Sequence, residues 1–378
     1  MKDITHLKII SKARQLNIKH IIKFTSVIYL IFISILLSLL FGILSCHNPV
    51  SPLEDKPGRR DYTWTVDTLE MEMNFISTIW GASANNVWAM GASGDARNRL
   101  WHFDGSIWSV YNKEAVFCGG WSLFGFSSDN VWMGGDDEGS NGASIWHFDG
   151  KNWKPNYFYN IQDSYQISIN KIFGSNPNDI YACGRVGYYK NGESSFISFV
   201  LHYNGNKWEE VVRGSLNDQF VNIIEENSIA YVYSQNLSHL GTNYNTLSFY
   251  EVDSASLKEI YSNTEGNINW INIFSIGGKL FFLIDKNVCF YRGDKFITQF
   301  SINKTNFSFY LFGRNEKDIF LNMKDGLAHY NGEDIEYLLH YPEYSRSFGE
   351  AAVFDKDVFQ VYYDNLTKKN MVLHGRLK

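Results

Sequence analysis

A short apolar hairpin recurs along the chain, and this recurrence limits what the chain can fold into. Its clearest copy runs from Ile145 to Trp153 and turns at Asp149-Gly150. Asp-Gly and Asn-Gly take the positive φ angles of a tight hairpin turn more readily than other dipeptides. The pattern returns at residues 100–108, 201–208 and 328–332. A copied hairpin indicates repeated sheet units, which must stack on one another to bury their apolar faces.

A second marker recurs beside the hairpin: an aromatic–glycine pair, a polar turn, then an aliphatic–aromatic pair. The aliphatic residue of each copy, strong or weak, is Val87, Val131, Ile180, Ile229, Leu280, Ile319 and Val358. These positions are separated by roughly 40 to 50 residues, which is the length of a four-stranded propeller blade. The sequence therefore predicts an all-β fold, a single β-propeller of seven blades. Six or eight blades remain open because the units near 229 and 280 are degenerate.

The ends of the chain predict how the ring closes. In the third unit we expect strands at 169–173, 180–183, 199–203 and 207–212, with tight polar turns between the first two and the last two, and a long loop in the middle. The last unit has strands at 351–354, 358–362 and 370–374 but no fourth strand. The segment Tyr62–Val66 carries Trp64, which matches the Trp of other fourth strands. We expect it to complete the last blade, so that residues 62–378 form one propeller without an unpaired edge.

Composition agrees with this fold class and excludes some functions. Aromatic residues make up 16% of the chain, and they favour a pleated, half-buried surface. The chain has 34 Lys and Arg and 40 Asp and Glu. Six of the basic residues but only one of the acidic residues precede residue 46, so the rest of the chain is acidic. An acidic body argues against nucleic acid as a partner. Cysteine occurs at 46, 118, 183 and 289 without a close pair, so we expect the last three to be buried packing residues.

The N-terminal region predicts an anchor. Residues 24–44 carry no charge and follow six Lys and Arg, and the end of this run forms part of the tetrapeptide Ile43-Leu44-Ser45-Cys46. This tetrapeptide resembles the lipobox of bacterial lipoproteins, and the resemblance implies cleavage before Cys46 and lipidation of that residue. We expect residues 1–45 to be a signal peptide, and 46–61, which contain Pro49, Pro52 and Pro57, to be a flexible tether. Retention of 24–44 as a transmembrane anchor is the alternative. Both place the propeller in the cell envelope, outside the cytoplasm, facing the periplasm or the cell surface.

Histidines recur at one position of the third strand: 102, 147, 202, 329 and 374. A residue repeated in every well-formed blade is expected to be framework, with a hydrogen bond across the following turn. The Asp-Gly turns resemble in part the Asp-box of sialidase-like propellers, without its leading Ser. The run Asp318-Ile319-Phe320 to Tyr330 resembles the propeller repeats of periplasmic two-component sensors and of assembly-factor-like bacterial lipoproteins. That resemblance implies a non-catalytic recognition platform.

One acidic loop and one face of the propeller are candidate sites. The acidic run Asp136, Asp137 and Glu138 is a weak candidate for Ca²⁺, since flexible oxygen ligands have no strict sequence rule. The other candidates are aromatic and cationic side chains on the face built from the longer loops, of the types that form binding hot spots. They lie between blades 2 and 3, in the long loop of blade 3, and between blades 6 and 7: Tyr157, Tyr159 and Tyr165; Arg185, Tyr188 and Tyr189; Tyr341, Tyr344 and Arg346.

These residues support one function above the others. We expect a lipid-anchored, monomeric propeller that binds a protein or peptide without catalysis and without a cofactor. A carbohydrate-binding or glycan-processing propeller is the alternative, and a purely structural envelope protein is a third. An enzyme would need carboxylates converging on the axial funnel, and no such pair stands out in the sequence.

Overall fold

The computed structural model describes residues 57–70, 75–91, 99–111, 118–237, 244–253, 256–263, 270–342 and 344–378. The predicted apolar segment 24–44 and Cys46 lie outside the described residues. Within these ranges, none of the helices is both long and apolar enough to span a bilayer. The strands of residues 57–378 form seven antiparallel sheets of four strands each.

The strands of blades 1 to 3 follow one another in chain order: β2 (Ile76–Ser83), β3 (Asn86–Gly91), β4 (Leu100–Phe103), β5 (Trp108–Val110); β6 (Cys118–Ser127), β7 (Asn130–Asp137), β8 (Ala143–Phe148), β9 (Trp153–Tyr159); β10 (Gln166–Asn176), β11 (Asp179–Lys190), β12 (Glu193–Tyr203), β13 (Trp208–Leu216). Blades 4 to 6 continue the series: β14 (Asp218–Glu226), β15 (Ile229–Leu237), β16 (Tyr244–Asp253), β17 (Ser256–Asn263); β18 (Ile271–Ile276), β19 (Lys279–Ile284), β20 (Asn287–Arg292), β21 (Lys295–Ser301); β22 (Phe307–Asn315), β23 (Asp318–Met323), β24 (Gly326–Tyr330), β25 (Ile335–His340).

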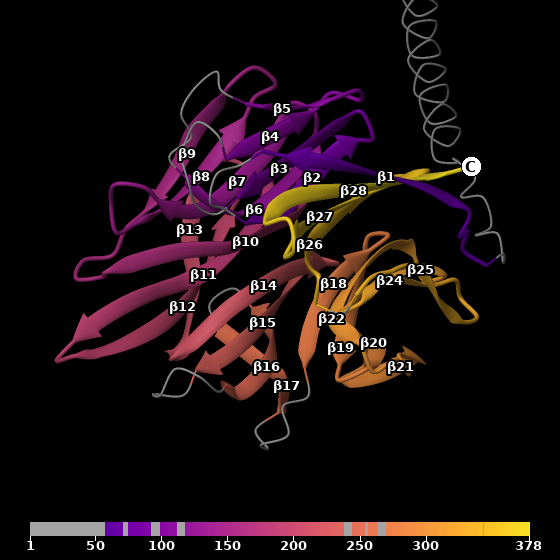
Figure 1. The fold of residues 1–378 in the computed structure, drawn as a ribbon. Coiled ribbons are helices and arrows are strands. Elements are labelled where there is room, and N and C mark those ends of the chain that lie inside the picture. The colour runs from indigo at the N-terminus through magenta and orange to yellow at the C-terminus, as the bar shows by residue number, and fades with distance from the viewer. Residues whose placement is uncertain are drawn as a thin grey trace, which may run out of the picture. The chain divides into compact units, whose positions relative to one another are not determined.

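The seventh blade joins the two ends of the propeller. Its strands are β26 (Arg346–Val353), β27 (Asp357–Asp364), β28 (Lys369–Leu377) and, as the outermost strand, β1 (Tyr62–Leu69). The first strand of every blade lies innermost, around a common axis (Figure 1). The predicted seven-bladed propeller is therefore confirmed, including its closure by the N-terminal strand.

Closure at the seventh blade depends on aromatic packing as well as on the strand ladder. Trp64 pairs with Gly375 in register, and a Cβ at Gly375 would stand 2.3 Å from the indole ring. Only a glycine at position 375 therefore leaves room for the Trp64 indole to lie across β28. Tyr62 is buried; its ring centroid lies 5.7 Å from that of Phe320 in blade 6, and its hydroxyl accepts a hydrogen bond of 2.7 Å from Arg314. The first strand thus covers the face that blade 6 presents to blade 7.

The hydrophobic core lies in layers between neighbouring blades. One such layer joins Trp88 and Met90 of blade 1 to Trp146, Phe148 and Trp153 of blade 2. Similar layers fill the other junctions. The three described cysteines, 118, 183 and 289, are free and buried in these layers, as predicted.

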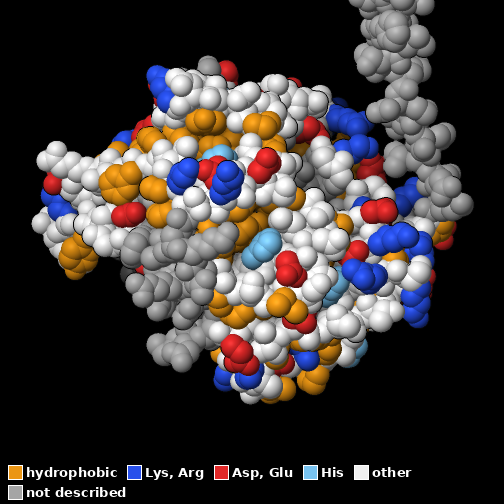
Figure 2. Space-filling view, turned by 90° about the horizontal axis from the view of Figure 1, so that it is seen from above, with side chains coloured by type: hydrophobic (Ala, Val, Ile, Leu, Met, Phe, Trp, Pro, Cys, Tyr) orange, Lys and Arg blue, Asp and Glu red, His pale blue; other side chains and the backbone are white. Residues whose placement is uncertain are grey.

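The recurring histidines are framework, as predicted, but their hydrogen-bond partner differs from the expected one. His202 Nε2 donates to Asp179 Oδ1 at 2.7 Å, and Asp179 is the first residue of the second strand rather than part of the turn after His202. His147, His329 and His374 bond in the same way to Asn130, Asp318 and Asp357. The rings of all five recurring histidines, His102 included, also pack on the aromatic residue two positions into that second strand, at centroid distances of 3.9–4.8 Å: Trp88, Trp132, Tyr181, Phe320 and Phe359. The histidine side chains visible on one face of the molecule lie apart from one another (Figure 2).

The Asp-Gly turns are wider than a two-residue hairpin. Asp104 Oδ1 accepts the N–H groups of Ser106 and Ile107 at 2.8 and 3.0 Å, and Gly105 has φ +96°. The loop between β4 and β5 therefore has four residues and is closed by the Asp side chain. Asp149, Asn204 and Asn331 close their loops in the same manner.

The middle connection of blade 3 is not the long loop that the sequence predicted. β11 and β12 continue in register to a two-residue turn, Asn191-Gly192, with φ values of +55° and +87°. These angles suit a tight hairpin turn, and the flanking aromatic and β-branched residues favour strand pairing. Arg185, Tyr188 and Tyr189 therefore belong to a strand. The expectation that Tyr157 and Tyr159 lie in a connection between blades was also wrong, because both lie in β9. Arg346, expected between blades 6 and 7, is the first residue of β26.

Replacement of Asp318 by Asn tests the framework role of the histidine bond. Burial alone would raise the pKa of Asp318, but the hydrogen bond from His329 and the nearby Arg314 outweigh it and hold the pKa below its ordinary value of 3.8. A carboxyl with a lowered pKa stabilises the fold above its unfolded-state pKa and loses that contribution as the pH falls through its folded-state pKa. We expect Asp318→Asn to lower the free energy of unfolding by about 1–3 kcal/mol at pH 7.

The loss should shrink as the pH falls below about 4, because the carboxyl is then protonated first in the unfolded state and, once the pH passes its lowered folded-state pKa, in the folded state too. Urea unfolding at pH 7 and pH 3 measures both values. Asp294→Asn, which removes an exposed partner of Lys258, is the matched control and should leave the midpoint unchanged. A deficit that is equal at both pH values would show that the charge of Asp318 does not matter.

Candidate functional site

Bulges in the innermost strands decide which side chains reach the axis. The inner strands of blades 1 to 4, 6 and 7 slip in register against their second strand near the middle. A bulge leaves extra residues unpaired and redirects their side chains. The extra residues are Ser77, Trp121, Asn170, Val221, residues 308–310 and residues 349–350.

Trp121 is the most unusual of these bulge residues. Its side chain is 43% exposed although it lies on β6, an innermost strand whose two faces are covered by neighbouring blades. The exposed indole must therefore face the axial opening. Beside it, Ser77 Oγ donates to the Gly120 carbonyl at 3.3 Å, which ties blade 1 to blade 2 at this level.

A charged network crosses the axis at the same level. Glu350 of β26 forms an ion pair with Lys171 of β10 and accepts a hydrogen bond of 2.8 Å from Thr78 Oγ1. Thr78 Oγ1 in turn accepts the Leu123 N–H at 3.1 Å. Blades 1 and 2 lie between blades 3 and 7 in the ring, so the Lys171–Glu350 pair spans the opening. Polar contacts therefore cross the axis at this level.

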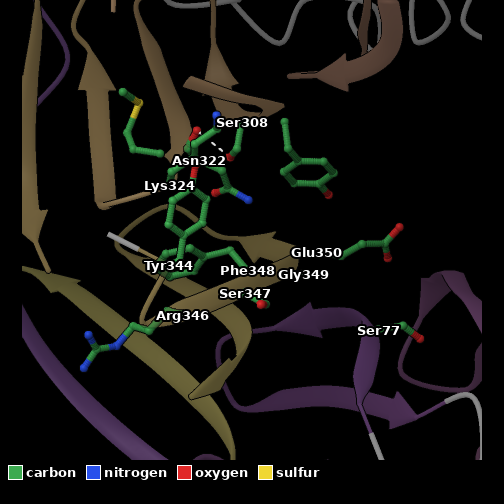
Figure 3. A pocket seen from close by; sticks show the side chains of 12 residues that line it. Ser77, Ser308, Asn322, Lys324, Tyr344, Arg346, Ser347, Phe348, Gly349 and Glu350 are labelled. Atoms are coloured by element: carbon green, nitrogen blue, oxygen red, sulfur yellow. Dashed lines mark hydrogen bonds between the residues drawn. The ribbon is translucent and has the colours of Figure 1, made fainter. Parts of the chain in front are cut away.

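A pocket of about 360 Å³ opens at the axial end of the junction between blades 6 and 7. Twelve residues from β2, β22, β23, β26 and their connections line it (Figure 3). Ser77 faces it from blade 1, while Ser347, Phe348, Gly349 and Glu350 follow one another along β26. We call this site the axial pocket. Two of the predicted binding residues, Tyr344 and Arg346, belong to it.

Two aromatic residues with left-handed backbone angles shape the axial pocket. Phe309 has φ +61° and Tyr344 has φ +58°, a conformation that costs bulky residues free energy. Phe309 stacks on Trp270 at a centroid distance of 5.6 Å, and its two neighbours, Ser308 and Tyr310, line the pocket. Ser308 Oγ donates to the Asn322 carbonyl at 2.8 Å. The irregular backbone at Phe309 therefore places a hydroxyl and a phenol in the pocket wall.

The cations of the axial pocket have different roles. Lys324 Nζ lies 5.9 Å from the ring centroid of Tyr344, whose side chain is 63% exposed. Arg346 extends away from the other labelled side chains (Figure 3). Its guanidinium lies 3.5 Å from the ring centroid of Tyr341 and 3.8 Å from the Asp364 carboxylate. Arg346 therefore braces the connection from β25 to β26, while Tyr344 and Lys324 are available at the mouth.

The aromatic residues predicted between blades 2 and 3 are mostly interior. Tyr159 is 5% exposed, its ring packs on Phe199 at 4.5 Å, and its hydroxyl donates to Glu210. Burial and the Glu210 carboxylate raise the pKa of Tyr159 well above its ordinary value. Tyr157 is partly buried against the same core layer. These two side chains extend the core of the blade 2–3 junction.

The remaining predicted residues lie at blade 3, apart from the axial pocket: Arg185, Tyr188 and Tyr189 are on the hairpin strand β11, and Tyr165 lies in the connection between blades 2 and 3, as predicted. Tyr165 and Tyr189 approach at a centroid distance of 6.5 Å, and Tyr189 is 66% exposed. Arg185 donates to Gln219 at 2.6 Å and lies over Phe196. Tyr188 packs against the core. Tyr165 and Tyr189 thus form a second, smaller exposed aromatic group.

The acidic run of blade 2 is engaged in local contacts. Glu138 forms an ion pair of 2.5 Å with Arg99, whose side chain is buried. Asp136 accepts a hydrogen bond from Gln166, and Asp137 accepts one from Ser140. In the described part of the chain, no three His, Cys, Asp or Glu side chains are grouped so that they could hold a metal ion.

Sequence reasoning missed several residues of the axial pocket and also Trp121, which lies on the inner strand β6. Trp121, Lys324, Ser308, Tyr310 and Glu350 were not among the predicted ligands. One signal was present: the bulge residue stands three positions before the aromatic–glycine pair, as Ser77 before Trp80 and Trp121 before Phe124. An aromatic residue at this place marks a side chain that faces the axis.

Known proteins share this architecture. No protein-family model and no curated protein sequence matches the chain. Among solved structures, YCF48 bound to D1 peptide superposes with a TM-score of 0.54 at 13% identity, covering 85% of this chain and 98% of that chain. Oligogalacturonate lyase in complex with manganese gives 0.56 at 9%, covering 85% and 98%. The β-propeller domain of Myceliophteria thermophila Cps50 (Swd1) gives 0.51 at 7%, covering 82% and 99%. At such identities the likeness shows the fold alone, a β-propeller.

Proposed function

We propose that this chain is an anchored envelope protein whose propeller binds a peptide or protein segment at the axial pocket without catalysis. The observation that carries the proposal is the pairing of a largely exposed Tyr344 with Lys324 at the mouth of a pocket of about 360 Å³. Tyrosine and cationic side chains in such a mouth are typical of polypeptide recognition.

The composition of the pocket wall favours binding over catalysis. Among the described residues that line it, Glu350 is the single carboxylate, and Lys171 and Thr78 already engage it. Glycoside hydrolysis needs two carboxylates placed on either side of the scissile bond. Serine hydroxyls and backbone groups of the wall offer hydrogen bonds to a peptide instead.

A peptide partner also agrees with a neighbour in structure, since YCF48 has been solved with a bound peptide. The alternative, a glycan ligand, is favoured by Trp121, because an exposed indole at the axis could stack on a sugar ring. A single screen can distinguish the two.

The screen offers the full-length chain, in detergent, both a displayed library of random linear peptides and a glycan array. We expect peptides to be enriched, and Tyr344→Ala to weaken the selected peptide by about tenfold or more, since hot-spot truncations exceed 2 kcal/mol. Tyr189→Ala is the matched control, because its side chain is equally exposed on a different blade.

Two outcomes would contradict the proposal. Binding that is lost in Tyr189→Ala and kept in Tyr344→Ala would move the site to blade 3. Saturable glycan binding that depends on Trp121, without peptide enrichment, would establish the carbohydrate alternative.

The anchor is part of the proposal and rests on the lipobox-like residues that end at Cys46. Metabolic labelling with a palmitate analogue should mark the native chain, and Cys46→Ser should lose the label. Cys289→Ser removes a buried cysteine and should keep it. A label that persists in Cys46→Ser, or an unlabelled native chain held in the membrane, would contradict lipidation and favour a retained 24–44 anchor.

A further inference from the structure

Three of the seven junctions between blades are filled by the same aromatic arrangement. In blade 1, Trp88 has His102 of its own blade on one side, at a centroid distance of 4.3 Å. On the other side it contacts Phe148 and Trp153 of blade 2, at 5.1 and 5.6 Å. Phe148 and Trp153 are paired in register across the turn between β8 and β9. The pair from the following blade therefore covers the aromatic residue of the second strand.

The same arrangement recurs at two further junctions. Trp132 of blade 2 contacts the pair Tyr203 and Trp208 of blade 3 at 5.3 and 5.9 Å. Phe359 of blade 7 contacts the pair Phe103 and Trp108 of blade 1 at 5.4 and 6.4 Å. At each of these places the fold shows that an indole ring fits against the covered aromatic residue.

The junction between blades 3 and 4 lacks this pair. Tyr181 has its own His202 at 4.4 Å, as in the other blades. The register of blade 4 puts Val252 opposite Leu257, at the positions that Tyr203 and Trp208 occupy in blade 3. Both pack in the core layer of this junction, but they are much smaller than an aromatic pair. A pocket of about 600 Å³ lies beside them, with Tyr181, His202, Val211 and Val252 in its wall.

The rim of this pocket, which we call the junction socket, is acidic. Glu251 and Asp253 line it, together with the ammonium group of Lys258. Lys258 is already held by Glu251 at 3.0 Å and by Asp294 at 3.2 Å. His202 donates to Asp179. Carboxylates therefore outnumber cations around the opening, and a positively charged group would be attracted to it.

We propose that the junction socket binds an aromatic side chain of a partner polypeptide, next to a basic residue. The aromatic ring occupies the place that an indole fills at the three junctions described above, against Tyr181. The basic neighbour lies at the rim, near Glu251 and Asp253. This site is separate from the axial pocket and does not depend on the function proposed for it.

The proposal can be tested by filling the junction socket with a larger side chain of the protein itself. The probe is the peptide acetyl-Lys-Trp-Lys-amide with 5-fluorotryptophan, followed by ¹⁹F NMR while the full-length chain is added in detergent. We expect a saturable shift of the fluorine signal. Leu257→Trp restores the aromatic side chain of the repeat, so it should weaken the peptide by about tenfold or more. Leu257→Met keeps the volume and should bind as the native chain does.

Competition with unlabelled compounds tests which chemical groups of a ligand the junction socket recognises. Unlabelled acetyl-Lys-Trp-Lys-amide should displace the probe, whereas acetyl-Lys-Leu-Lys-amide, acetyl-Glu-Trp-Glu-amide and N-acetylglucosamine should not. Glu251→Gln should weaken the basic peptide, and Tyr344→Ala in the axial pocket should have no effect. This last variant separates the present proposal from the function proposed for the axial pocket.

Three results would overturn the proposal. The first is full binding in Leu257→Trp with the native circular dichroism spectrum. The second is equal displacement by the leucine peptide or by the sugar, and the third is no shift at all. Should Leu257→Trp fail to fold, Leu257→Tyr gives the same test with a smaller ring.

Discussion

Every blade of this protein has two apolar faces, and both must be covered by neighbouring blades. The buried residues accordingly lie in layers between blades. Large aromatic side chains bury about 150–250 Å² each, so a layer such as that around Trp88 contributes heavily to stability. An uncovered blade at either end would expose such a layer to water. The chain avoids this by pairing β1 with β28, which closes the ring.

The repeat also separates framework from function. Residues that recur in each well-formed blade, such as His202 with Asp179, hold the second and third strands together. Three pockets lie where the pattern is broken: one at the irregular backbone around Phe309, and two beside the degenerate blades 4 and 5. Val252 and Leu257 show this most simply, because a change of two side chains in an otherwise regular junction leaves the socket open.

Sequence periodicity predicted the blade number and the closing strand because both depend on local patterns. The spacing of the aliphatic markers and the match of Trp64 to other fourth strands were sufficient. The partner of His202 could not be predicted, since strand register decides that Asp179 lies beside it. The axial pocket was found only through Tyr344 and Arg346, because its other residues reach it through bulges and through the positive φ of Phe309. Such backbone angles follow from packing between distant segments, which a single sequence does not display.

Hydrogen exchange of the amides that bond β1 to β28 tests the closed ring most directly. Our account predicts that these amides exchange only when the whole propeller unfolds, as slowly as the corresponding amides of β9 and β13, which are outermost strands within continuous blades. Exchange of the β1 amides at least about a hundredfold faster, while β26, β27 and β28 stay protected, would show that the first strand opens alone. The propeller would then stay closed without β1, contrary to the central claim.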